Sequence, residues 1–345
     1  MNVLSLFDGI SAGQFALQKA SIKVDNYYAS EIDKYAIQIA NKNFPNTIQL
    51  GSITDWNKWD IDFSKIDVVI GGSPCQGFSF AGKQLNFDDP RSKLFFDFVN
   101  ILNHIKVLNP NVKFLLENVR MKKEYQDVIS KFLGVNPVFI NSSLLSAQNR
   151  PRLYWTNISE LSQPKDKEIL LIDIIEGNKV EDKYMLSKEA IDYMSRLRNG
   201  KPRWEYHKNP LDGKAACLTA NMYKGVPYGV LTIEKDINLL IVNEATKKGS
   251  VEVYPGDGVD LIFAKSKTRR GRLMEDKSNC LTATAHDYCF WNGYVIRKLT
   301  PIECERLQTF PDNYTEGISN SQRYKALGNS WTVDVIAYIF EGING

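Results

Sequence analysis

The sequence predicts an α/β protein with a mostly parallel sheet in its main domain and a second, smaller, irregular domain. Up to residue 158, short runs rich in β-branched residues alternate with amphipathic stretches, which is the pattern of βαβ units. This alternation is lost over 159–296, and regular patterns return over 297–345. We therefore expect one domain over 1–158, a second over 159–296, and a final segment, 297–345, that returns to complete the first.

The elements of the first domain follow from local patterns. Helices are expected where apolar residues keep one helical face, as Ala12, Phe15, Ala16 and Leu17 do. Strands are expected where β-branched and aromatic residues run together between turns. The predicted strands are 2–7, 25–30, 47–50, 67–72 and 113–119, and the predicted helices are 11–20, 32–44 and 91–108.

The two later segments differ in regularity. Residues 159–296 carry turn-rich stretches such as "NPLDGK" and "YPGDGVD", and "AACLTANMY" (215–223) is partly echoed by "SNCLTATAH" (278–286). Two copies are too few for a solenoid, so an irregular, loop-rich module is expected. The last segment ends in a predicted helix whose apolar stripe is formed by Val333, Ile336, Ala337 and Phe340.

Charge and cysteine content narrow the class of protein. The net charge of +3 does not by itself indicate a nucleic acid partner. Basic clusters at 201–208 and 265–272 favour one, and a solvated charged face is the alternative. The five cysteines are odd in number and form no CxxC pair, which argues against a disulfide framework and against a metal site. No run of about 18 apolar residues and no signal-peptide pattern is present, so a cytoplasmic protein with reduced thiols is expected.

Several polar motifs stand where predicted strands end. In open parallel sheets, ligands bind outside the carboxyl ends of the strands. The first strand ends in "FDGISAG" (7–13), the second in Glu31, the 67–72 strand in "GGSPCQG", and the 113–119 strand in "ENV". A glycine-rich turn and an acidic residue at the second strand end favour a nucleoside cofactor, whereas the turn alone is also compatible with a plain strand–turn–helix corner.

Cys75 and Glu117 are the candidate catalytic residues. Pro74 fixes the backbone before Cys75, and strand-end amides favour a thiolate there, although a free cysteine is most often a small buried hydrophobe. Glu117 closes an apolar strand, where partial desolvation is expected to raise its pKa so that it holds a proton near neutral pH. Its alternative is a structural carboxylate paired with an arginine. A thiolate, a protonated glutamate and a nucleoside cofactor together suggest covalent catalysis on an electron-poor ring.

The order of the motifs resembles that of the DNA (cytosine-5)-methyltransferase family, in its stand-alone bacterial or phage form. The resemblance rests on "FDGISAG", "GGSPCQGFS", "ENV", "QNRPR", "RKLTPIECERLQTFP" and "YKALGNSWTV", and covers nearly the whole chain except 159–296. It implies a Rossmann-like S-adenosylmethionine-dependent methyltransferase sheet with a smaller, irregular target-recognition domain. It also implies methylation of cytosine C5 in a specific sequence of double-stranded DNA, S-adenosyl-L-homocysteine as product, and a place in a prokaryotic cell or phage-infected host. A cognate restriction endonuclease that acts separately is a candidate partner, and the sequence does not show whether one exists. A monomer is our default expectation for the oligomeric state.

The resemblance assigns a cofactor pocket residue by residue. Phe7 is expected to stack on adenine and Glu31 to hold the ribose. At position 52 the family usually has an aspartate that grips the adenine amino group, whereas this chain has a serine, which accepts a hydrogen bond without a charge. The implied cofactor-binding residues are Phe7, Gly9, Ile10, Ser11, Gly13, Glu31, Ile32, Ser52, Ile53, Pro74, Leu94, Asn329 and Ser330.

The resemblance also assigns catalytic roles. Cys75 is expected to attack cytosine C6 while Glu117 donates to N3, with Arg152 holding the base near O2 and Arg150 buttressing it. The base must be flipped out of the duplex for this, and the loop 79–93 is expected to close over it.

DNA contacts are predicted from basic residues. In the closing loop, Lys83 and Arg91 either touch phosphates or are solvated. In the target-recognition part, Arg269, Arg270, Arg272 and the two "CLTA" segments are expected to contact base edges, with phosphate positioning as the alternative. Cys304 is expected to be structural.

Three rival functions remain open at this point. The first is the same chemistry on RNA, as in tRNA-modifying relatives. The second is an NAD(P)-dependent oxidoreductase on a similar sheet, against which the absence of a GxGxxG motif counts. The third is a non-catalytic DNA-binding protein on this fold, against which the presence of Cys75, Glu117 and Arg152 counts.

Overall fold

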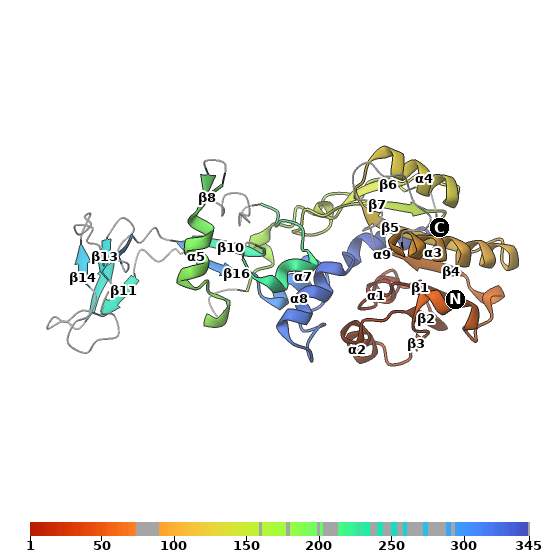
Figure 1. The fold of residues 1–345 in the computed structure, drawn as a ribbon, viewed down its shortest axis with the longest axis horizontal. Helices are drawn as coiled ribbons and strands as arrows, with labels where there is room; N and C mark the ends of the chain where they lie inside the picture. Colours follow the sequence, from red (N-terminus) through yellow and green to blue (C-terminus); the bar gives the residue numbers. More distant parts are fainter. Residues whose placement is uncertain are drawn as a thin grey trace.

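The computed structural model is built around one seven-stranded sheet, with an elongated extension at one end (Figure 1). It describes residues 1–73, 90–158, 161–176, 180–198, 201–202, 213–226, 228–234, 240–243, 250–253, 258–260, 272–274, 288–290 and 294–343. The mixed α/β class predicted from the sequence is confirmed. In the described part of the chain, no helix is long and apolar enough to cross a membrane.

The sheet has the strand order β3-β2-β1-β4-β5-β7-β6. The strands are β1 (Asn2–Leu6), β2 (Asn26–Ser30), β3 (Ile48–Gln49), β4 (Val68–Gly71), β5 (Lys113–Val119), β6 (Val138–Asn141) and β7 (Pro151–Thr156). The first five are parallel to one another, and the strand order reverses between β1 and β4. A ligand crevice is expected at such a switch point, beyond the carboxyl ends of the strands.

Helices cover the two faces of the sheet because the strands are apolar on both sides. Val3 and Ile70 belong to one buried cluster with α1 and α9, whereas Leu4 and Val69 belong to another with α3 and α4. This is the side-chain alternation expected of a strand buried on both faces. The helices are α1 (Ala12–Lys19), α2 (Lys34–Asn43), α3 (Pro90–Leu108), α4 (Lys123–Leu133) and α9 (Val333–Glu341).

The far edge of the sheet holds its antiparallel pairs, in a sheet that is otherwise parallel, as the prediction of a mostly parallel sheet allows. β7 runs antiparallel to both β5 and β6, with Val119 opposite Arg152. This register brings the end of β5 beside the start of β7. The glutamate of one strand and the arginine of the other therefore come from opposite strand ends and meet at the same edge of the sheet.

Residues 159–296 form small, separate elements within the described ranges. They are α5 (Lys188–Ser195), β8 (Leu197–Arg198), β9 (Lys201–Pro202), β10 (Val230–Glu234), β11 (Leu240–Asn243), β12 (Ser250–Val253), β13 (Gly258–Asp260), β14 (Arg272–Met274) and β15 (Tyr288–Phe290), followed by β16 (Tyr294–Lys298). β11, β13 and β14 lie at the end of the molecule farthest from the seven-stranded sheet (Figure 1). The division into domains at residues 158 and 296 stays a prediction.

The chain then returns to the main sheet through α7 (Pro301–Leu307), α8 (Asn320–Asn329) and α9. Thr300 caps α7 in a capping box with Glu303, and Pro301 occupies its first turn. The predicted apolar stripe of the last helix is buried, and α9 packs against α1. The hydroxyl of Tyr314 donates to the carbonyl oxygen of Ile10 at 2.7 Å, which anchors this segment to the turn after β1.

Candidate active site

A cavity of about 620 Å³ opens at the carboxyl ends of β1, β2, β4 and β5. This volume is in the range of small-molecule sites. Its walls come from segments far apart in the sequence, which lie at 7–10, 30–36, 52–53, 72–73, 94, 117–119, 150–152, 217–220 and 322–330. The cavity therefore has one wall at the turns that follow β1 and β2. Its other wall is at the end of β5 and the start of β7.

The turn after β1 has an unusual backbone. Phe7, Gly9 and Ser11 all have left-handed conformations, with φ of 59°, 60° and 59°. A bulky residue such as phenylalanine rarely adopts this region, and such strain is concentrated at functional sites. Phe7 lines the cavity as a result.

The buried side chain of Asp8 stabilises this turn through hydrogen bonds. It is buried, and its carboxylate accepts hydrogen bonds from the hydroxyls of Ser11 and Tyr27, the latter at 2.7 Å. Burial raises the pKa of Asp8 to about 6, against the lowering effect of these hydrogen bonds. The carboxylate of Glu31 adds a smaller contribution in the same direction as burial.

Glu31 is fixed at the end of β2 by three backbone amides. Its Oε2 accepts from the amide of Gly9 at 2.8 Å, and its Oε1 accepts from the amides of Ile32 and Asp33 at 2.7 and 2.8 Å. Ile32 is 76% exposed beside it at the cavity wall. The turn after β1 and the acidic residue after β2 are thus joined directly by a hydrogen bond, as expected for residues at the carboxyl ends of neighbouring parallel strands.

The other predicted cofactor residues divide into those on the cavity wall and those behind it. Ile10, Ser52, Ile53, Leu94, Asn329 and Ser330 line the cavity together with Phe7, Gly9, Glu31 and Ile32. Ser11 is buried against Asp8, and Gly13 faces Ile70, so neither lines the cavity. Pro74 lies outside the described residues.

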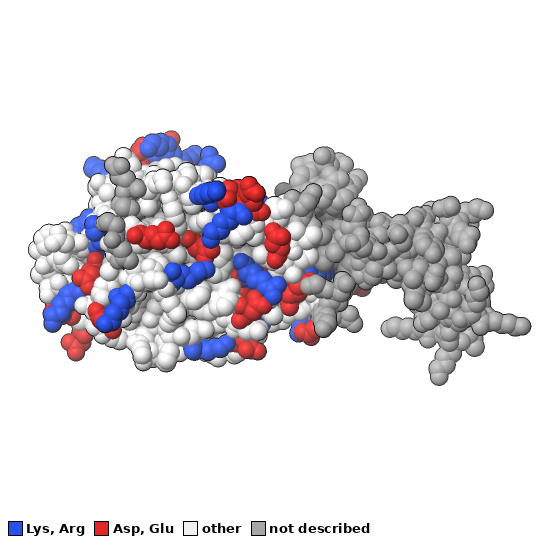
Figure 2. Space-filling model, turned by 180° about the vertical axis from the view of Figure 1, so that it is seen from behind, with Lys and Arg blue, Asp and Glu red and all other residues white. Residues whose placement is uncertain are grey.

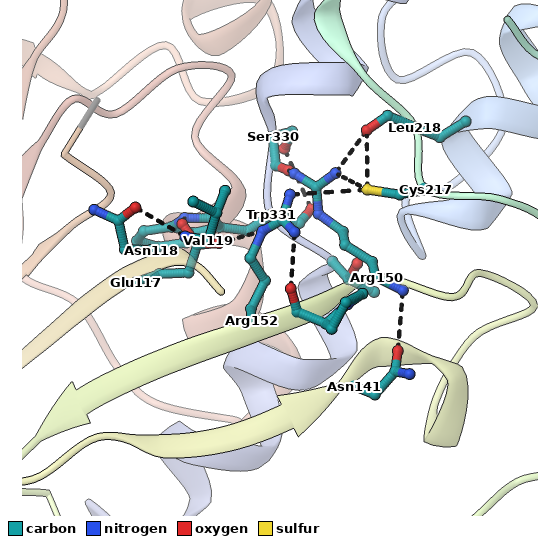
Figure 3. A network of polar contacts seen from close by, with 12 residues as sticks. Glu117, Asn118, Val119, Asn141, Arg150, Arg152, Cys217, Leu218, Ser330 and Trp331 are labelled. Atoms are coloured by element: carbon teal, nitrogen blue, oxygen red, sulfur yellow. Dashed lines mark hydrogen bonds and ion pairs between the residues drawn. The ribbon is translucent and has the colours of Figure 1, made fainter. Parts of the chain in front are cut away.

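Glu117 is held on both oxygens (Figure 3). Its Oε1 pairs with Nε of Arg152 at 2.8 Å, and its Oε2 accepts from the indole Nε1 of Trp331 at 3.1 Å. The side chains of Glu117 and Arg152 are 11% and 13% exposed, so this ion pair is largely shielded from water. The arginine partner considered as an alternative for Glu117 is present, and both members of the pair line the cavity.

Arg150 lies behind this pair and joins two distant segments. Its guanidinium donates to the carbonyl oxygens of Leu218 at 2.8 Å, Ser330 at 2.7 Å and Gly328 at 3.3 Å, and to Sγ of Cys217 (Figure 3). Burial lowers the pKa of Arg150, and the charge of Arg152 lowers it further. Burial acts in the same direction on Arg152 and is the largest single effect there, but Glu117, Cys217 and Tyr154 together outweigh it, so the pKa of Arg152 is raised.

Several predicted residues fall where the structure gives no side-chain description. Cys75, Lys83, Arg269 and Arg270 lie outside the described residues. The backbone of Arg91 belongs to α3, and that of Arg272 belongs to β14. The chain reaches residue 74 from Ser73, which lines the cavity and accepts from Nδ2 of Asn118.

Two cavity features were not predicted from the sequence. The "CLTA" segment at 217–220 lines the cavity, whereas we expected it to contact base edges. Trp331 contacts Glu117, although it is 214 residues away in the sequence. The repeated "CLTA" motif did mark the first segment as unusual, but its position is shown only by bonds in the structure, such as those from Arg150 and Gln148 to Leu218.

Comparison with solved structures shows that the fold is a known one. The Dnmt2 methyltransferase of S. pombe aligns over 100% of both chains with a TM-score of 0.61 and 18% identity. The Entamoeba histolytica methyltransferase EhMeth aligns over 99% of this chain and 97% of its own, with a TM-score of 0.65 and 18% identity. At these identities the likeness concerns the fold alone, which is that of a Rossmann-like methyltransferase.

Sequence comparison identifies the family. The Type II methyltransferase M1.ScrFI of Lactococcus lactis subsp. cremoris is 30% identical over 98% of this chain and 77% of its own. M.HpaII of Haemophilus parainfluenzae is 29% identical over 96% and 86%, and the orphan methyltransferase M.SPRI of Bacillus phage SPR is 27% identical over 99% and 97%. The chain belongs to the C-5 cytosine-specific DNA methylase family, which matches residues 1–345.

The protein is therefore a DNA (cytosine-5-)-methyltransferase, and the resemblance stated from its motifs is confirmed. Enzymes of this family use S-adenosyl-L-methionine as methyl donor. They flip the target cytosine out of the helix and form a transient covalent bond to its C6 atom. The family membership leaves open which side chains of this chain take each part.

Proposed function

We propose that this enzyme methylates cytosine C5 within one specific sequence of double-stranded DNA, and that Cys75 and Glu117 carry the chemistry. The observation that supports this most directly is the position of Glu117. It lines the same cavity as Glu31 and is held on both oxygens by nitrogen donors. One cavity thus offers a nucleoside-binding wall and a fixed carboxyl group on the other side.

The residues present fit an adenosine-bearing cofactor. The carboxylate of Glu31 is an acceptor for ribose hydroxyls, the ring of Phe7 provides an aromatic surface, and Ile10, Ile53 and Leu94 make the wall apolar. Ser52 lies on this wall, where its hydroxyl contacts the hydroxyl of Thr54 at 2.8 Å and accepts from the amide of Thr54 at 3.3 Å. A contact with an adenine amino group would use the second lone pair of this oxygen. Ser11 and Gly13 would act from behind the wall, by shaping the turn. When bound, S-adenosyl-L-methionine supplies a methyl group made electrophilic by its sulfonium.

The chain's own residues make the cytosine ring a nucleophile. The thiolate of Cys75 forms a bond to C6, while Glu117 donates a hydrogen bond or proton at N3, so that electron density moves to C5. Arg152 holds the base near O2 and also fixes Glu117, and Arg150 supports the segment behind them. After methylation, a base removes the C5 proton, and the electron pair of that C–H bond restores the C5–C6 double bond. The C6–S bond breaks, Cys75 leaves as a thiolate, and the proton given to N3 returns to Glu117.

The recognition of DNA is proposed at a coarser level. DNA is the substrate of the family, and the basic residues Arg269, Arg270 and Arg272 are proposed to contact base edges, with Lys83 and Arg91 touching phosphates. On the face shown in Figure 2, acidic and basic side chains are interspersed, so binding would depend on such local groups. The domain division at 158 and 296 is part of this proposal.

The cellular setting is proposed from the relatives. Two of them are named Type II methyltransferases, which supports a cognate restriction endonuclease that acts separately, whereas the phage SPR enzyme is named an orphan. Their bacterial and phage sources support a place in the cytoplasm of a prokaryotic cell or phage-infected host. A monomer is our proposal for the oligomeric state.

Trapping on modified DNA tests the proposal. With S-adenosyl-L-methionine and DNA containing 5-fluorocytosine, the wild-type enzyme is expected to form a covalent adduct on Cys75, because fluorine cannot leave C5 as a proton does. C75S should form none, and E117Q should form it about a hundredfold more slowly. C304A, which removes a fully buried thiol in α7, should form it normally and serves as the matched control.

The methylated sequence is read by bisulfite sequencing of DNA from a methylation-free host that expresses the chain. One sequence context is expected. Methyl transfer to tRNA with none to DNA would support RNA as the substrate instead. DNA binding without any adduct would support a non-catalytic DNA-binding protein.

A further inference from the structure

Trp331 supports the candidate catalytic carboxyl group from outside the cavity. It follows the "GNS" segment between α8 and α9, and its indole is half-buried. Its Nε1 donates to Oε2 of Glu117 at 3.1 Å, while Arg152 occupies Oε1 (Figure 3). Glu117 is among the residues that line the cavity and Trp331 is not, so the indole contacts the carboxyl group from behind.

Two glycines allow the indole to lie there. A Cβ atom at Gly72 would be 2.9 Å from Nε1 of Trp331 and 3.2 Å from Oε2 of Glu117. A Cβ atom at Gly13 would be 3.4 Å from Cζ3 of the same ring. The backbone after β4 and the first turn of α1 thus pack closely on the indole, which limits its movement.

The backbone on either side of the indole is also held. The carbonyl oxygen of Ser330 accepts from Arg150 at 2.7 Å and from Gln308 at 3.2 Å. The hydroxyl of Thr332 donates to Oε1 of Gln308 at 2.8 Å. Ser330 and Thr332 are both buried, so the position of the Trp331 ring is set by its neighbours on both sides.

The chemistry of an indole N–H suits this place. It donates and cannot accept, so the lone pair of Oε2 that it occupies cannot carry the carboxyl proton. Arg152 has the same effect on one lone pair of Oε1. Together the two donors fix the plane of the carboxyl group and leave its remaining positions for contact with the base.

We propose that Trp331 is a positioning residue for methyl transfer, which acts through Glu117 by fixing the orientation of its carboxyl group. The inference rests on the proposed role of Glu117 in contacting cytosine N3. It predicts that loss of the indole N–H slows the chemical step and leaves the binding of cofactor and DNA unchanged.

W331F tests this by keeping an aromatic ring and removing the donor. The single-turnover rate of methyl transfer is expected to fall about tenfold, because the hydrogen bond that orients the carboxyl group of Glu117 is lost. KM for S-adenosyl-L-methionine and for DNA should stay within about twofold of wild type. W59F is the matched control, because Nε1 of Trp59 is buried and has no hydrogen-bond partner among the residues that the structure describes. Its rate should equal that of wild type.

A double-mutant cycle with E117Q separates positioning from a structural role. If Trp331 acts through Glu117, W331F should cost less than about twofold in the E117Q background. An equal fall in both backgrounds, an unchanged rate for W331F, or a rise in both KM values would overturn the inference. If W331F does not fold, benzothienylalanine at position 331 replaces the N–H by sulfur in a ring of the same shape, and the same comparisons decide.

The two proposals fail in different ways. If wild type transfers no methyl group to DNA, or if E117Q equals wild type, the proposed function is wrong. If wild type is active and E117Q is impaired, but W331F gives one of the contradicting results named above for the double-mutant cycle, only the proposed role of Trp331 is wrong.

Discussion

Asp8 is a buried carboxyl group in the strained turn that ends β1, and its environment makes the stability of the protein depend on pH. Burial raises its pKa from 3.8 to about 6. Between these two values the folded state binds a proton that the unfolded state has released. Stability therefore falls as the pH rises through this window, and it stays at the lower level above it.

D8N is expected to remove this dependence. Relative to D8N, the free energy of unfolding of the wild type should fall by about 2 kcal/mol between pH 4 and pH 6, because each pKa unit of the shift from 3.8 to about 6 is worth about 1.4 kcal/mol and part of the total effect lies outside these two pH values. Urea unfolding at a series of pH values measures this. D60N changes an exposed aspartate and should follow the wild-type curve. Parallel curves for wild type and D8N would contradict the account.

At the scale of single residues, the sequence located those side chains whose place follows from a strand end. Glu31 and Glu117 were predicted in this way, because the carboxyl ends of parallel strands meet at one edge. The positions of Trp331 and Cys217 at the site could not be predicted from strand ends, because the hydrogen bonds that place them connect segments far apart in the sequence. Periodicity and turn signals report only on near neighbours along the chain.

At the scale of elements, the contact of α1 with β4 depends on one missing side chain. A Cβ atom at Gly13 would overlap Cδ1 of Ile70, and it would lie 3.1 Å from the hydroxyl of Tyr27. Ile70 is fully buried in β4, so it cannot turn away into solvent. The glycine sets how closely the helix approaches the sheet, and with it the position of the turn after β1.

G13A is expected to destabilise the protein by about 1–3 kcal/mol through overpacking. I70V alone should cost about 1 kcal/mol. In the double variant, removal of Cδ1 makes room for the new methyl group, so the total cost should be less than the sum of the two. Thermal or urea unfolding of the four proteins gives the coupling. Strictly additive costs would show that Ile70 is not the residue that excludes a side chain at position 13.

Sequence patterns predicted some of these helices and strands, but not the direction of the strands at the edge of the sheet. β1, β2, β4 and β5 were predicted because β-branched runs stand between turns, and α3 and α9 because their apolar residues follow a helical period. α4, β6 and β7 were not predicted, and neither was the antiparallel direction of β7. Alternating burial looks the same in a strand of either direction, so only the register with its neighbours shows which way it runs.

At the scale of the whole molecule, "QNRPR" connects three parts of the chain. Gln148 accepts from the amide of Leu218 at 2.9 Å and donates to the carbonyl oxygen of Leu307 at 3.1 Å. Arg150 donates to the carbonyl oxygens of Leu218 and Ser330. The cavity walls at 217–220 and 328–330 are therefore attached to the main sheet by two buried side chains. The integrity of the site should depend on these side chains as much as on its own residues.

R150K is expected to loosen both attached segments together. A lysine lacks the planar fork that reaches these carbonyl oxygens at once, so the free energy of unfolding should fall by about 2–4 kcal/mol. Hydrogen exchange should accelerate in 215–224 and in 326–332, while β1 and β4 keep their protection until global unfolding. R120K, which makes the same change at an exposed arginine, should stay within about 0.5 kcal/mol of wild type. Faster exchange in only one of the two segments would show that Arg150 does not join them, because the carbonyl oxygens it contacts in each are released by the same substitution.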